Sequence, residues 1–415
     1  MADAYIIDAV RTPRGIGKVG KGSLAHLHPQ HLSATVLKAI AERNDLDTAL
    51  VDDVIWATST QVGKQGTDIG RMSALAAGYD IRASGMTLDR FCGSGITSVS
   101  LAASQIMSGM EDCVVAGGCE MMSYTASIAD PAKPPMLDGD NMALRDMHPQ
   151  TQQGVAADAI ATLEGIDREA LDHLALTSQQ RAARAIEEGR FERSVVPVME
   201  EDGETVALDH EEFPRPGTTK EGLAGLKTVF SQWKDIPVDE TGQTYGDLVE
   251  RRYPELKDKW QHMHHAGNSS GVVDGAAALL LTSPEFAQEH GLTPRARIVT
   301  AVNMGDDPTL MLNAPVPAAR KALERAGLSK DDIDVWEINE AFAVVAEKFI
   351  RDLELNREKV NINGGAMALG HPIGATGSIL IGTALDELER SEGRYALVTM
   401  CAAGGMAPAI IIERV

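Results

Sequence analysis

The chain has 415 residues and is 44% hydrophobic, which is enough for two or three packed domains with large cores. Its 60 acidic residues against 38 basic ones give a formal charge of -22, which argues against nucleic acid or an anionic membrane as a partner. No apolar stretch approaches the roughly 20 residues that span a bilayer, and the N-terminal apolar run is too short for a signal peptide. We therefore expect a cytoplasmic protein.

Strands and helices alternate through the first 121 residues, which is typical of an α/β fold. Residues 113–118 (CVVAGG) form a continuous apolar run, as a buried strand does. Cys113 and Cys119 lie on or beside this run, and we expect both to be structural. The other predicted elements of this part are strands at 3–10 and 51–58, a Gly-rich loop at 11–22, a helix from there to about residue 43, and a helix at 67–78.

The stretch from Thr87 to Met110 indicates a strand end, a sharp turn at Cys92, and a helix with apolar residues at helical spacing. Cys92 thus lies at a helix start, where unpaired N–H groups and the positive end of the helix dipole lower a thiol pKa. We expect Gly93, Ser94 and Gly95 to keep the approach to its sulfur open. The pattern is that of a nucleophilic cysteine, although a small buried cysteine in a Gly-rich turn fits it too.

Residues 122–265 are largely loop-like and polar, and we interpret them as an inserted domain. Within them, residues 231–263 carry apolar side chains at a partly helical spacing that Pro254 interrupts. Two interpretations stay open for this segment. It is either a surface helix that covers the core, or a lid over a substrate channel or a surface for a partner.

Two motifs near the end of this region indicate functions that the context does not favour. His262, His264 and His265 have the composition of a metal site, but no carboxylate lies nearby at ligand spacing, so no metal is expected. GNSSG at 267–271 matches the G-x-S-x-G turn of α/β-hydrolases, with Ser269 at its centre. That turn needs a strand before it and a helix after it, whereas here an apolar strand follows.

The C-terminal part repeats the α/β rhythm. A Gly-rich turn with His371 leads into a helix, and a late turn places Cys401 before Gly404 and Gly405. Both parts thus put a reactive residue in a Gly-rich turn before a helix and an apolar strand, which indicates an internal duplication. The glycines around His371 lack the G-x-G-x-x-G spacing, so no nicotinamide cofactor is expected. The other predicted elements are strands at 296–302, 335–338 and 395–399 and helices at 316–326 and 341–353.

The Gly-rich turns together offer Cys92, His371, Cys401 and the pair Asn339-Glu340 at the end of an apolar strand. A nucleophilic thiolate, an imidazole that activates it and a second thiol that carries a proton form a coherent set for acyl transfer. The motifs FCGSG, GNSSGVVDGAA, INEAFA, NGGAMALGHPIGATG and a late C-x-x-G-G turn follow one another over nearly the whole chain. In these motifs and their order the chain resembles the thiolase family.

The resemblance implies an α/β thiolase fold, with two duplicated halves in a five-layered αβαβα core and an inserted loop domain that holds coenzyme A. We place the N-terminal half at 1–121 plus 266–292, the loop domain at 122–265 and the C-terminal half at 293–415. The implied activity is cleavage of a 3-oxoacyl-CoA by free CoA, or the reverse Claisen condensation. CoA and acyl-CoA are then substrates, and neither a permanently bound cofactor nor a metal is expected.

The family assembles as homodimers or homotetramers, which implies a homo-oligomer here. Whether the loop domain also recruits a β-oxidation enzyme stays open.

The resemblance also carries roles over, residue by residue. Cys92 matches the nucleophile that becomes acylated, and His371 matches the histidine that deprotonates it. Cys401 matches the cysteine that moves a proton to or from the acetyl α-carbon. Asn339 matches the residue that orients a water in one oxyanion site, and the backbone N–H groups of Cys92 and Ala403 lie where the second is formed.

For the CoA side, Ser270 matches the family's serine that contacts the pantetheine. Lys227 lies where the family places a basic residue near the nucleotide end, with a solvated surface lysine as the alternative. Ala341 and Phe342 of the INEAFA motif complete the predicted set of substrate-binding residues.

Three departures from the family pattern concern the substrate. The family's Met-Gly is here Gln153-Gly154, Ala403 replaces a glycine, and the segment after Phe230 is long. They favour degradation of longer or bulkier acyl chains, with a short-chain biosynthetic acetoacetyl-CoA thiolase as the alternative. Cys401 argues against a 3-oxoacyl synthase of the same superfamily. The intact set of catalytic residues argues against a non-catalytic acyl-CoA-binding protein.

Overall fold

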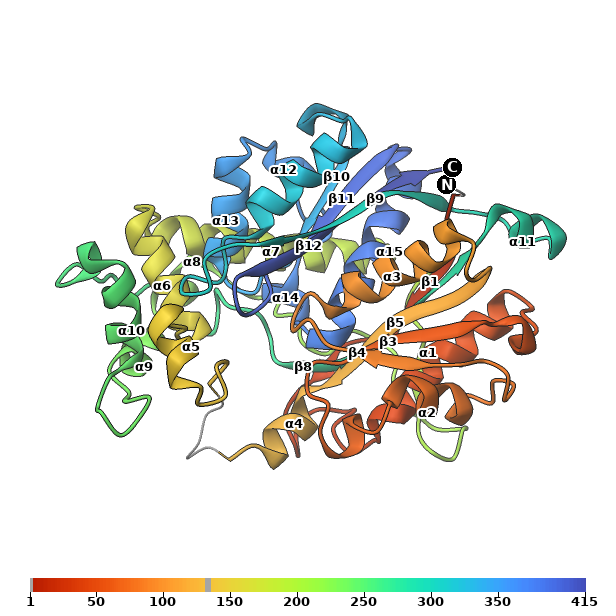
Figure 1. Ribbon diagram of the computed structural model, residues 1–415, viewed down its shortest axis with the longest axis horizontal. Helices are drawn as coiled ribbons and strands as arrows, with labels where there is room; N and C mark the ends of the chain where they lie inside the picture. Colours follow the sequence, from red (N-terminus) through yellow and green to blue (C-terminus); the bar gives the residue numbers. More distant parts are fainter. Residues whose placement is uncertain (1–2, 131–135) are drawn as a thin grey trace.

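The computed structural model describes residues 3–130 and 136–415, and its strands form one large mixed sheet and a small two-stranded one (Figure 1). The strands of the large sheet are β1 (Tyr5–Arg11), β2 (Gly15–Ile16), β3 (Asp53–Ala57), β4 (Met86–Leu88), β5 (Cys113–Met121), β8 (Val273–Thr282), β9 (Ala296–Gly305), β10 (Val335–Ile338), β11 (Tyr395–Thr399) and β12 (Met406–Arg414). The small sheet pairs β6 (Val198–Met199) with β7 (Val206–Leu208). The predicted strands are present, with ends that shift by up to three residues.

The helices of the first half and the inserted segment are α1 (Pro29–Arg43), α2 (Ile69–Ala76), α3 (Ser94–Ser108), α4 (Met122–Ile128), α5 (Met142–Met147), α6 (Gln153–Leu163), α7 (Arg168–Glu187), α8 (Lys220–Ala224), α9 (Phe230–Lys234) and α10 (Tyr245–Arg252). Those that follow are α11 (Pro284–Glu289), α12 (Pro315–Ala326), α13 (Ala343–Asp352), α14 (Ala366–Leu369) and α15 (Ile373–Ser391). Among the described residues, none of these helices is long and apolar enough to cross a membrane.

The strand order of the large sheet shows an internal duplication. The order is β10-β11-β12-β9-β1-β8-β5-β3-β4, so that β3-β5-β8-β1 and β10-β11-β12-β9 are equivalent quartets. In each quartet the first pair is parallel and the next two pairs are antiparallel. In each, a helix after a Gly-rich turn connects the parallel pair: α3 in one half and α15 in the other. The predicted duplication is therefore confirmed.

The helices and the two halves of the sheet form five layers (Figure 1). α3 and α15 pack against each other in the middle layer, around a buried cluster that includes Ile96, Val99 and Leu385. α1 and α2 cover the outer face of the first half, and α12 and α13 cover the outer face of the second, each over its own buried cluster. This is the αβαβα order that the resemblance implies.

Glycines bring α3 and α15 into close contact. A Cβ added at Gly95 would lie 2.8 Å from the backbone nitrogens of Gly377 and Ser378, which is closer than real side chains come. Gly93 is packed as tightly, since a Cβ there would lie 2.8 Å from Pro408. That these glycines also keep the approach to the sulfur open stays a prediction. They let the helix start fit against the rest of the core.

Helices α5, α6, α8, α9 and α10 of the inserted segment lie at one end of the molecule (Figure 1). The two longest helices of the segment, α6 and α7, share a core with the C-terminal half. Ile160 of α6 and Leu171 of α7 belong to the same buried cluster as Trp336 and Phe349. The domain boundaries given above stay a prediction.

Cys113 and Cys119 lie in β5, where both are fully buried and carry free thiols. The Cys119 sulfur donates to the carbonyl oxygen of Pro29 at 3.5 Å. Both belong to the buried apolar cluster of the N-terminal half, which is the environment expected of structural cysteines.

We expect Gly95→Ala to lower the free energy of unfolding by about 1 to 3 kcal/mol, because the new methyl group pushes α3 away from α15. Urea unfolding followed by circular dichroism measures this change. Ser104→Ala, on the exposed side of the same helix, is the control and should shift it by less than about 0.5 kcal/mol. A Gly95→Ala variant as stable as the wild type would contradict the tight crossing.

Candidate active site

The start of α3 and the start of α15 meet where the two helices cross. Cys92 lies just before α3, and His371 lies just before α15. A Cβ at Gly95 would lie 3.0 Å from the Gly374 carbonyl oxygen, so the first turns of the two helices are in contact. The crossing thus brings together the predicted nucleophile and the predicted base, which are far apart in the sequence and belong to different halves of the duplicated fold.

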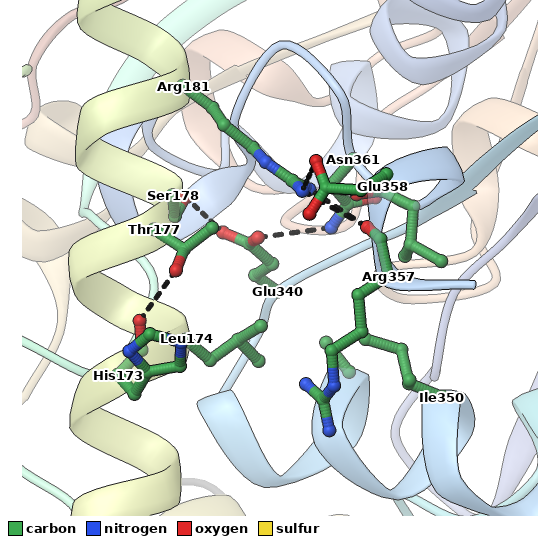
Figure 2. Close-up of a pocket in the computed structure, with 12 residues that line it drawn as sticks. His173, Leu174, Thr177, Ser178, Arg181, Glu340, Ile350, Arg357, Glu358 and Asn361 are labelled. Carbon is green, nitrogen blue, oxygen red and sulfur yellow. Dashed lines mark hydrogen bonds and ion pairs between the residues drawn. The ribbon is translucent and has the colours of Figure 1, made fainter. Parts of the chain in front are cut away.

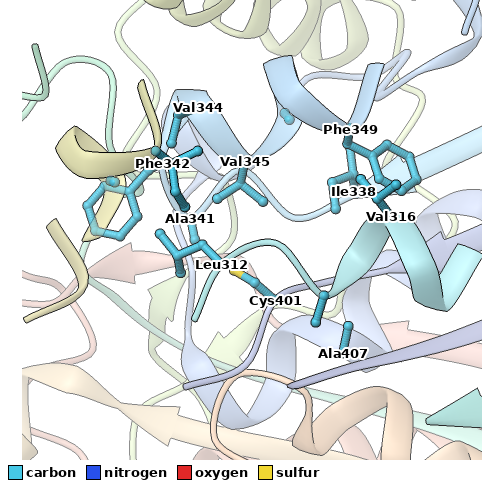
Figure 3. Packing of buried hydrophobic residues seen from close by; sticks show 14 of the residues in the cluster. Leu312, Val316, Ile338, Ala341, Phe342, Val344, Val345, Phe349, Cys401 and Ala407 are labelled. Carbon is cyan, nitrogen blue, oxygen red and sulfur yellow. The ribbon is translucent and has the colours of Figure 1, made fainter. Parts of the chain in front are cut away.

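The turn that carries Cys401 lies beside this crossing. A Cβ at Gly93 would lie 3.4 Å from the Ala402 side chain. Burial, and then the nearby Cys92 thiol, raise the pKa of the Cys401 thiol. Figure 3 shows Cys401 beside Leu312, within the same buried cluster. The structure therefore places the second predicted cysteine next to the first.

The turn before Cys92 is held in an unusual backbone conformation. Phe91 has a φ of 49°, in the left-handed region that aromatic residues rarely adopt. The Asp89 carboxylate accepts the Phe91 N–H at 2.6 Å. The Ser94 hydroxyl accepts the Arg90 N–H and donates to the Phe91 carbonyl oxygen, both at 2.6 Å. These bonds stabilise a strained turn directly before the candidate nucleophile.

Cys92 is a neutral thiol in this structure. It is only 7% exposed, and burial raises the pKa of its thiol to about 12. The prediction that the helix start lowers this pKa is therefore wrong. The backbone of Cys92 and the side chain of Gln153 do lower it through hydrogen bonds, but the loss of hydration outweighs them. Cys92 needs a base to become a nucleophile.

His371 has the protonation state that such a base requires. The Thr376 hydroxyl donates to the Pro372 carbonyl oxygen at 2.9 Å, so it must accept from His371 Nδ1, at 2.6 Å. The proton is therefore on Nδ1, and Nε2 carries the lone pair. Nε2 is buried and has no hydrogen-bond partner among the described residues. Burial lowers the pKa of His371 to about 4, so the ring is neutral near pH 7.

Asn339 follows β10, and its backbone N–H donates to the Thr399 carbonyl oxygen at 3.2 Å. Both polar atoms of its carboxamide are buried without a partner among the described residues. Leaving such a group unpaired costs about 1 to 3 kcal/mol. A cost of this size is expected where a substrate or a water molecule completes the hydrogen bonds.

A tight turn connects Cys401 to β12 and contains Ala403. It is closed by two backbone hydrogen bonds, from Ala402 N–H to Met406 O at 2.7 Å and from Met406 N–H to Ala402 O at 3.1 Å. The two glycines that follow Ala403 have φ angles of 77° and 76°, which lie in the left-handed region. The turn depends on those glycines rather than on Ala403, so replacing the family's glycine by alanine leaves its backbone donor in place.

Glu340 links three segments of the site. Its carboxylate accepts from the Ser178 hydroxyl at 2.6 Å, from the Asn361 amide at 3.1 Å and from the Met367 backbone N–H at 3.2 Å. Figure 2 shows it pointing toward Ser178 on one side and Asn361 on the other. The residue next to Asn339 thereby fixes the NEAF turn to α7, to the loop at Asn361 and to α14. The sequence motif contains Glu340 but does not show this role.

A cavity of about 80 Å³ lies beside Glu340 (Figure 2). Arg181 and Arg357 also line it, and Arg181 donates to the Val360 carbonyl oxygen at 2.6 Å. The space suits two or three water molecules and is too small for an acyl-CoA.

The predicted substrate-binding residues of two motifs meet. The Ser270 N–H donates to the Ala341 carbonyl oxygen at 3.0 Å, and Ser269 and Phe342 form a β-bridge. The GNSSG turn leads into strand β8 rather than a helix, so Ser269 lacks the context of a hydrolase nucleophile. Lys227 is exposed in the loop after α8, and the structure does not place it against the other predicted residues.

A second cavity, of about 180 Å³, lies beside the GNSSG turn and was not predicted. Gly267, Thr218 and Arg215 line it, and the Arg215 guanidinium lies 5.6 Å from the ring centre of Phe213. The signal that could have identified it is an arginine within a Pro-, Gly- and Thr-rich stretch, PRPGTT, of an acidic chain.

The three clustered histidines are held by carboxylates from distant helices. His262 and His264 contact Asp158 of α6 at 3.0 and 2.7 Å, and His265 contacts Asp172 of α7 at 2.8 Å. The sequence shows no nearby carboxylate because both lie about a hundred residues earlier. Within the described ranges, no group of three His, Cys, Asp or Glu side chains is arranged to hold a metal ion.

Two family models match this chain: Thiolase, N-terminal domain, over residues 4–234, and Thiolase, C-terminal domain, over residues 292–414. The chain belongs to the thiolase family. As a thiolase the protein is an acyltransferase, which agrees with the thiols, the imidazole and the carboxamide that its turns bring together.

Full-length relatives support the same assignment. This thiolase is 39% identical to a beta-ketoadipyl-CoA thiolase of Acinetobacter baylyi, over 100% of both chains. It is 40% identical to a steroid 3-ketoacyl-CoA thiolase of Mycobacterium tuberculosis, over 100% of this chain and 95% of the other. The crystal structure of the Bacillus anthracis acetyl-CoA acetyltransferase matches with a TM-score of 0.83 and 33% identity, over 100% of this chain and 99% of that one.

The protonation states predict the pH dependence of the reaction. Because the pKa of His371 is lowered to about 4, kcat/KM should fall on the acid side only as the pH approaches that value, instead of near 6.5. Because the pKa of Cys92 is raised to about 12, its alkylation by iodoacetamide should keep accelerating up to about pH 10. An acid limb near 6.5, or a plateau of alkylation near neutral pH, would contradict the neutral pair.

Proposed function

We propose that this thiolase cleaves a 3-oxoacyl-CoA with free CoA, and runs the reverse condensation, through an acyl group on Cys92. The observation that carries the proposal is the juxtaposition of a neutral, buried Cys92 thiol with the start of α15, where His371 has an unpaired Nε2. A second buried thiol, Cys401, lies beside them. An acyl transfer that also makes or breaks a carbon–carbon bond needs a nucleophile, a base and a separate proton carrier.

In the first half of the proposed reaction, His371 Nε2 takes the proton of Cys92 as the sulfur attacks the 3-oxo carbon. The bond between carbons 2 and 3 breaks, the acyl group stays on Cys92, and Cys401 protonates the released enolate to give acetyl-CoA. In the second half, the thiol of a new CoA gives its proton to the Cys401 thiolate as its sulfur attacks the acyl carbon. The bond between that carbon and Cys92 breaks, and the protonated His371 returns its proton to the Cys92 thiolate.

Both halves develop negative charge on a thioester oxygen. The unpaired carboxamide of Asn339 supports one oxyanion site, through a water molecule that it orients. The backbone N–H groups of Cys92 and Ala403 support the other. Each such donor contributes about 3 to 4 kcal/mol to transition-state stabilisation in enzymes of this kind.

We propose that CoA binds along the paired GNSSG and NEAF turns, as a substrate rather than a permanently held group. Ser270 and Ala341 are joined there by a backbone hydrogen bond, and the cavity with Arg215 lies next to them. In a chain of charge -22, the phosphates need local cations. Arg215 and the exposed Lys227 supply them in this proposal.

We further propose acyl groups larger than acetyl. Gln153, in place of the family's methionine, hydrogen-bonds to the Cys92 thiol and so puts a polar group at the acyl site. The names of the relatives, which refer to beta-ketoadipyl-CoA and to steroid 3-ketoacyl-CoA, support larger acyl groups. A short-chain acetoacetyl-CoA thiolase is the second candidate, because a relative of 37% identity from Cupriavidus necator is named acetyl-CoA acetyltransferase.

We also propose that the protein is a homodimer in the cytoplasm. β4 is the last strand of the sheet order, so within the described ranges its outer edge has no strand partner. The adjacent α2 exposes Met72 and Leu75, and Ile81 is 80% exposed. Two such edges can pair about a twofold axis and cover these side chains.

Light scattering should give at least twice the mass of the chain. A monomer at micromolar concentration would contradict the proposed dimer.

Thiolysis assays test the proposed reaction. We expect the wild type to consume 3-oxoadipyl-CoA faster than acetoacetyl-CoA, only when CoA is present, and with ping-pong kinetics. Acetoacetyl-CoA as the better substrate would favour the short-chain candidate.

Cys401→Ala should slow the exchange of acetyl α-protons by about 100-fold or more, because the proton carrier is lost. A variant that exchanged them at the original rate would contradict the mechanism.

A further inference from the structure

The long segment at residues 231–263 packs into the molecule instead of projecting over a channel. Tyr245, Leu248 and Val249 of α10 are almost fully buried. Tyr245 and Val249 belong to the buried cluster that also contains Leu312 and Cys401. Of the two interpretations that the sequence left open, the helix that covers the core fits these observations.

The end of α10 holds a loop that comes from the C-terminal half. Tyr253, directly after α10, donates its hydroxyl proton to the carboxylate of Asp307, in the loop that follows β9. The other oxygen of Asp307 accepts the backbone N–H of Thr309 at 3.0 Å. A hydrogen bond to an ionised carboxylate is stronger than one between neutral groups. This side-chain bond therefore fixes the start of the loop to the inserted segment.

The same loop lies against the turn that carries Cys401. The Asp306 N–H donates to the Gly405 carbonyl oxygen at 2.7 Å. A Cβ at Gly405 would lie 2.6 Å from the Asp306 carbonyl oxygen and 2.7 Å from that of Asp307, so the two segments are in direct contact. A displacement of Asp307 must therefore displace the Cys401 turn.

A second contact passes through the chain before α6. The Thr309 hydroxyl donates to the Pro149 carbonyl oxygen at 2.6 Å, and the Thr151 hydroxyl donates to the Tyr245 carbonyl oxygen at 3.0 Å. Residues 149–151 thus lie between the start of α10 and the loop. Both ends of α10 are connected to the segment that supports Cys401.

We propose that Tyr253 is a positioning residue for the Cys401 turn: its hydrogen bond to Asp307 keeps residues 306–307 against Gly405. The turn in turn sets the places of the Cys401 thiol and the Ala403 N–H. Through Tyr253, the inserted segment thereby takes part in the step at the α-carbon. This inference rests on the function proposed above.

Two partial reactions separate these steps. Exchange of the acetyl group between acetyl-CoA and labelled CoA needs Cys92 and His371, and it breaks carbon–sulfur bonds but no carbon–carbon or carbon–hydrogen bond. Exchange of the α-protons of acetyl-CoA in D₂O needs Cys401. Tyr253→Phe should slow proton exchange about 10- to 100-fold, as small misplacements of reacting groups do. It should slow acetyl exchange by a smaller factor, because that reaction uses the Ala403 N–H of the turn but not the Cys401 thiol.

Two sets of variants serve as controls. Lys257→Ala, at an exposed site of the same segment, should leave both reactions unchanged. Asp307→Asn keeps an oxygen that accepts from Tyr253 but loses the bond from the Thr309 N–H, so it should slow proton exchange less than Asp307→Ala, which should behave like Tyr253→Phe. The Asp307 pair decides the question even if Tyr253→Phe fails to fold.

The outcomes distinguish this inference from the proposed function. A wild type that catalyses neither exchange would overturn the proposed function itself. A wild type that catalyses both, with variants that slow both equally or slow neither, would overturn the positioning role of Tyr253 and leave the thiolase reaction in place.

Discussion

The contact between α3 and α15 is the constraint on which the site depends. Gly95 and Gly377 leave no room for a Cβ, so the two helices approach more closely than side chains allow. Each helix belongs to one half of the duplicated sheet and begins in a Gly-rich turn. Their contact therefore brings together one reactive turn from each half. The duplicated fold supplies the two turns, and the glycines set the distance between them.

Burial then determines the chemistry that these turns support. The same loss of hydration that raises the pKa of Cys92 lowers the pKa of His371, so both are neutral before substrate binds. In the proposed reaction, charge appears only when a proton moves from Cys92 to His371. In that proposal, the unpaired carboxamide of Asn339 and the closed turn around Ala403 supply the donors that stabilise the negative charge on the substrate.

The sequence was sufficient to predict the features that repeat locally or that form motifs. The rhythm of strands and helices predicted an α/β fold, and the two Gly-rich turns before helices predicted the duplication that the strand order shows. The motifs placed Ser270 and Ala341 in turns that do pair. The roles of the site residues and the domain boundaries stay predictions.

The features that the sequence could not show depend on partners that are distant in the chain. The packing role of Gly95 depends on residues almost three hundred positions later, and the carboxylates beside the histidines come from α6 and α7. The predicted lowering of the Cys92 pKa was wrong because a local rule about helix starts does not include the effect of burial. The contact of Tyr253 with Asp307 likewise joins the inserted segment to a loop of the C-terminal half.

The measurement that most directly tests the account is the intact mass of the protein after brief exposure to 3-oxoadipyl-CoA or acetoacetyl-CoA, followed by peptide mapping. The account predicts one acyl group, located on Cys92, removed by free CoA and absent in Cys92→Ser. An unmodified Cys92 with both substrates, or an acyl group on another residue, would contradict it.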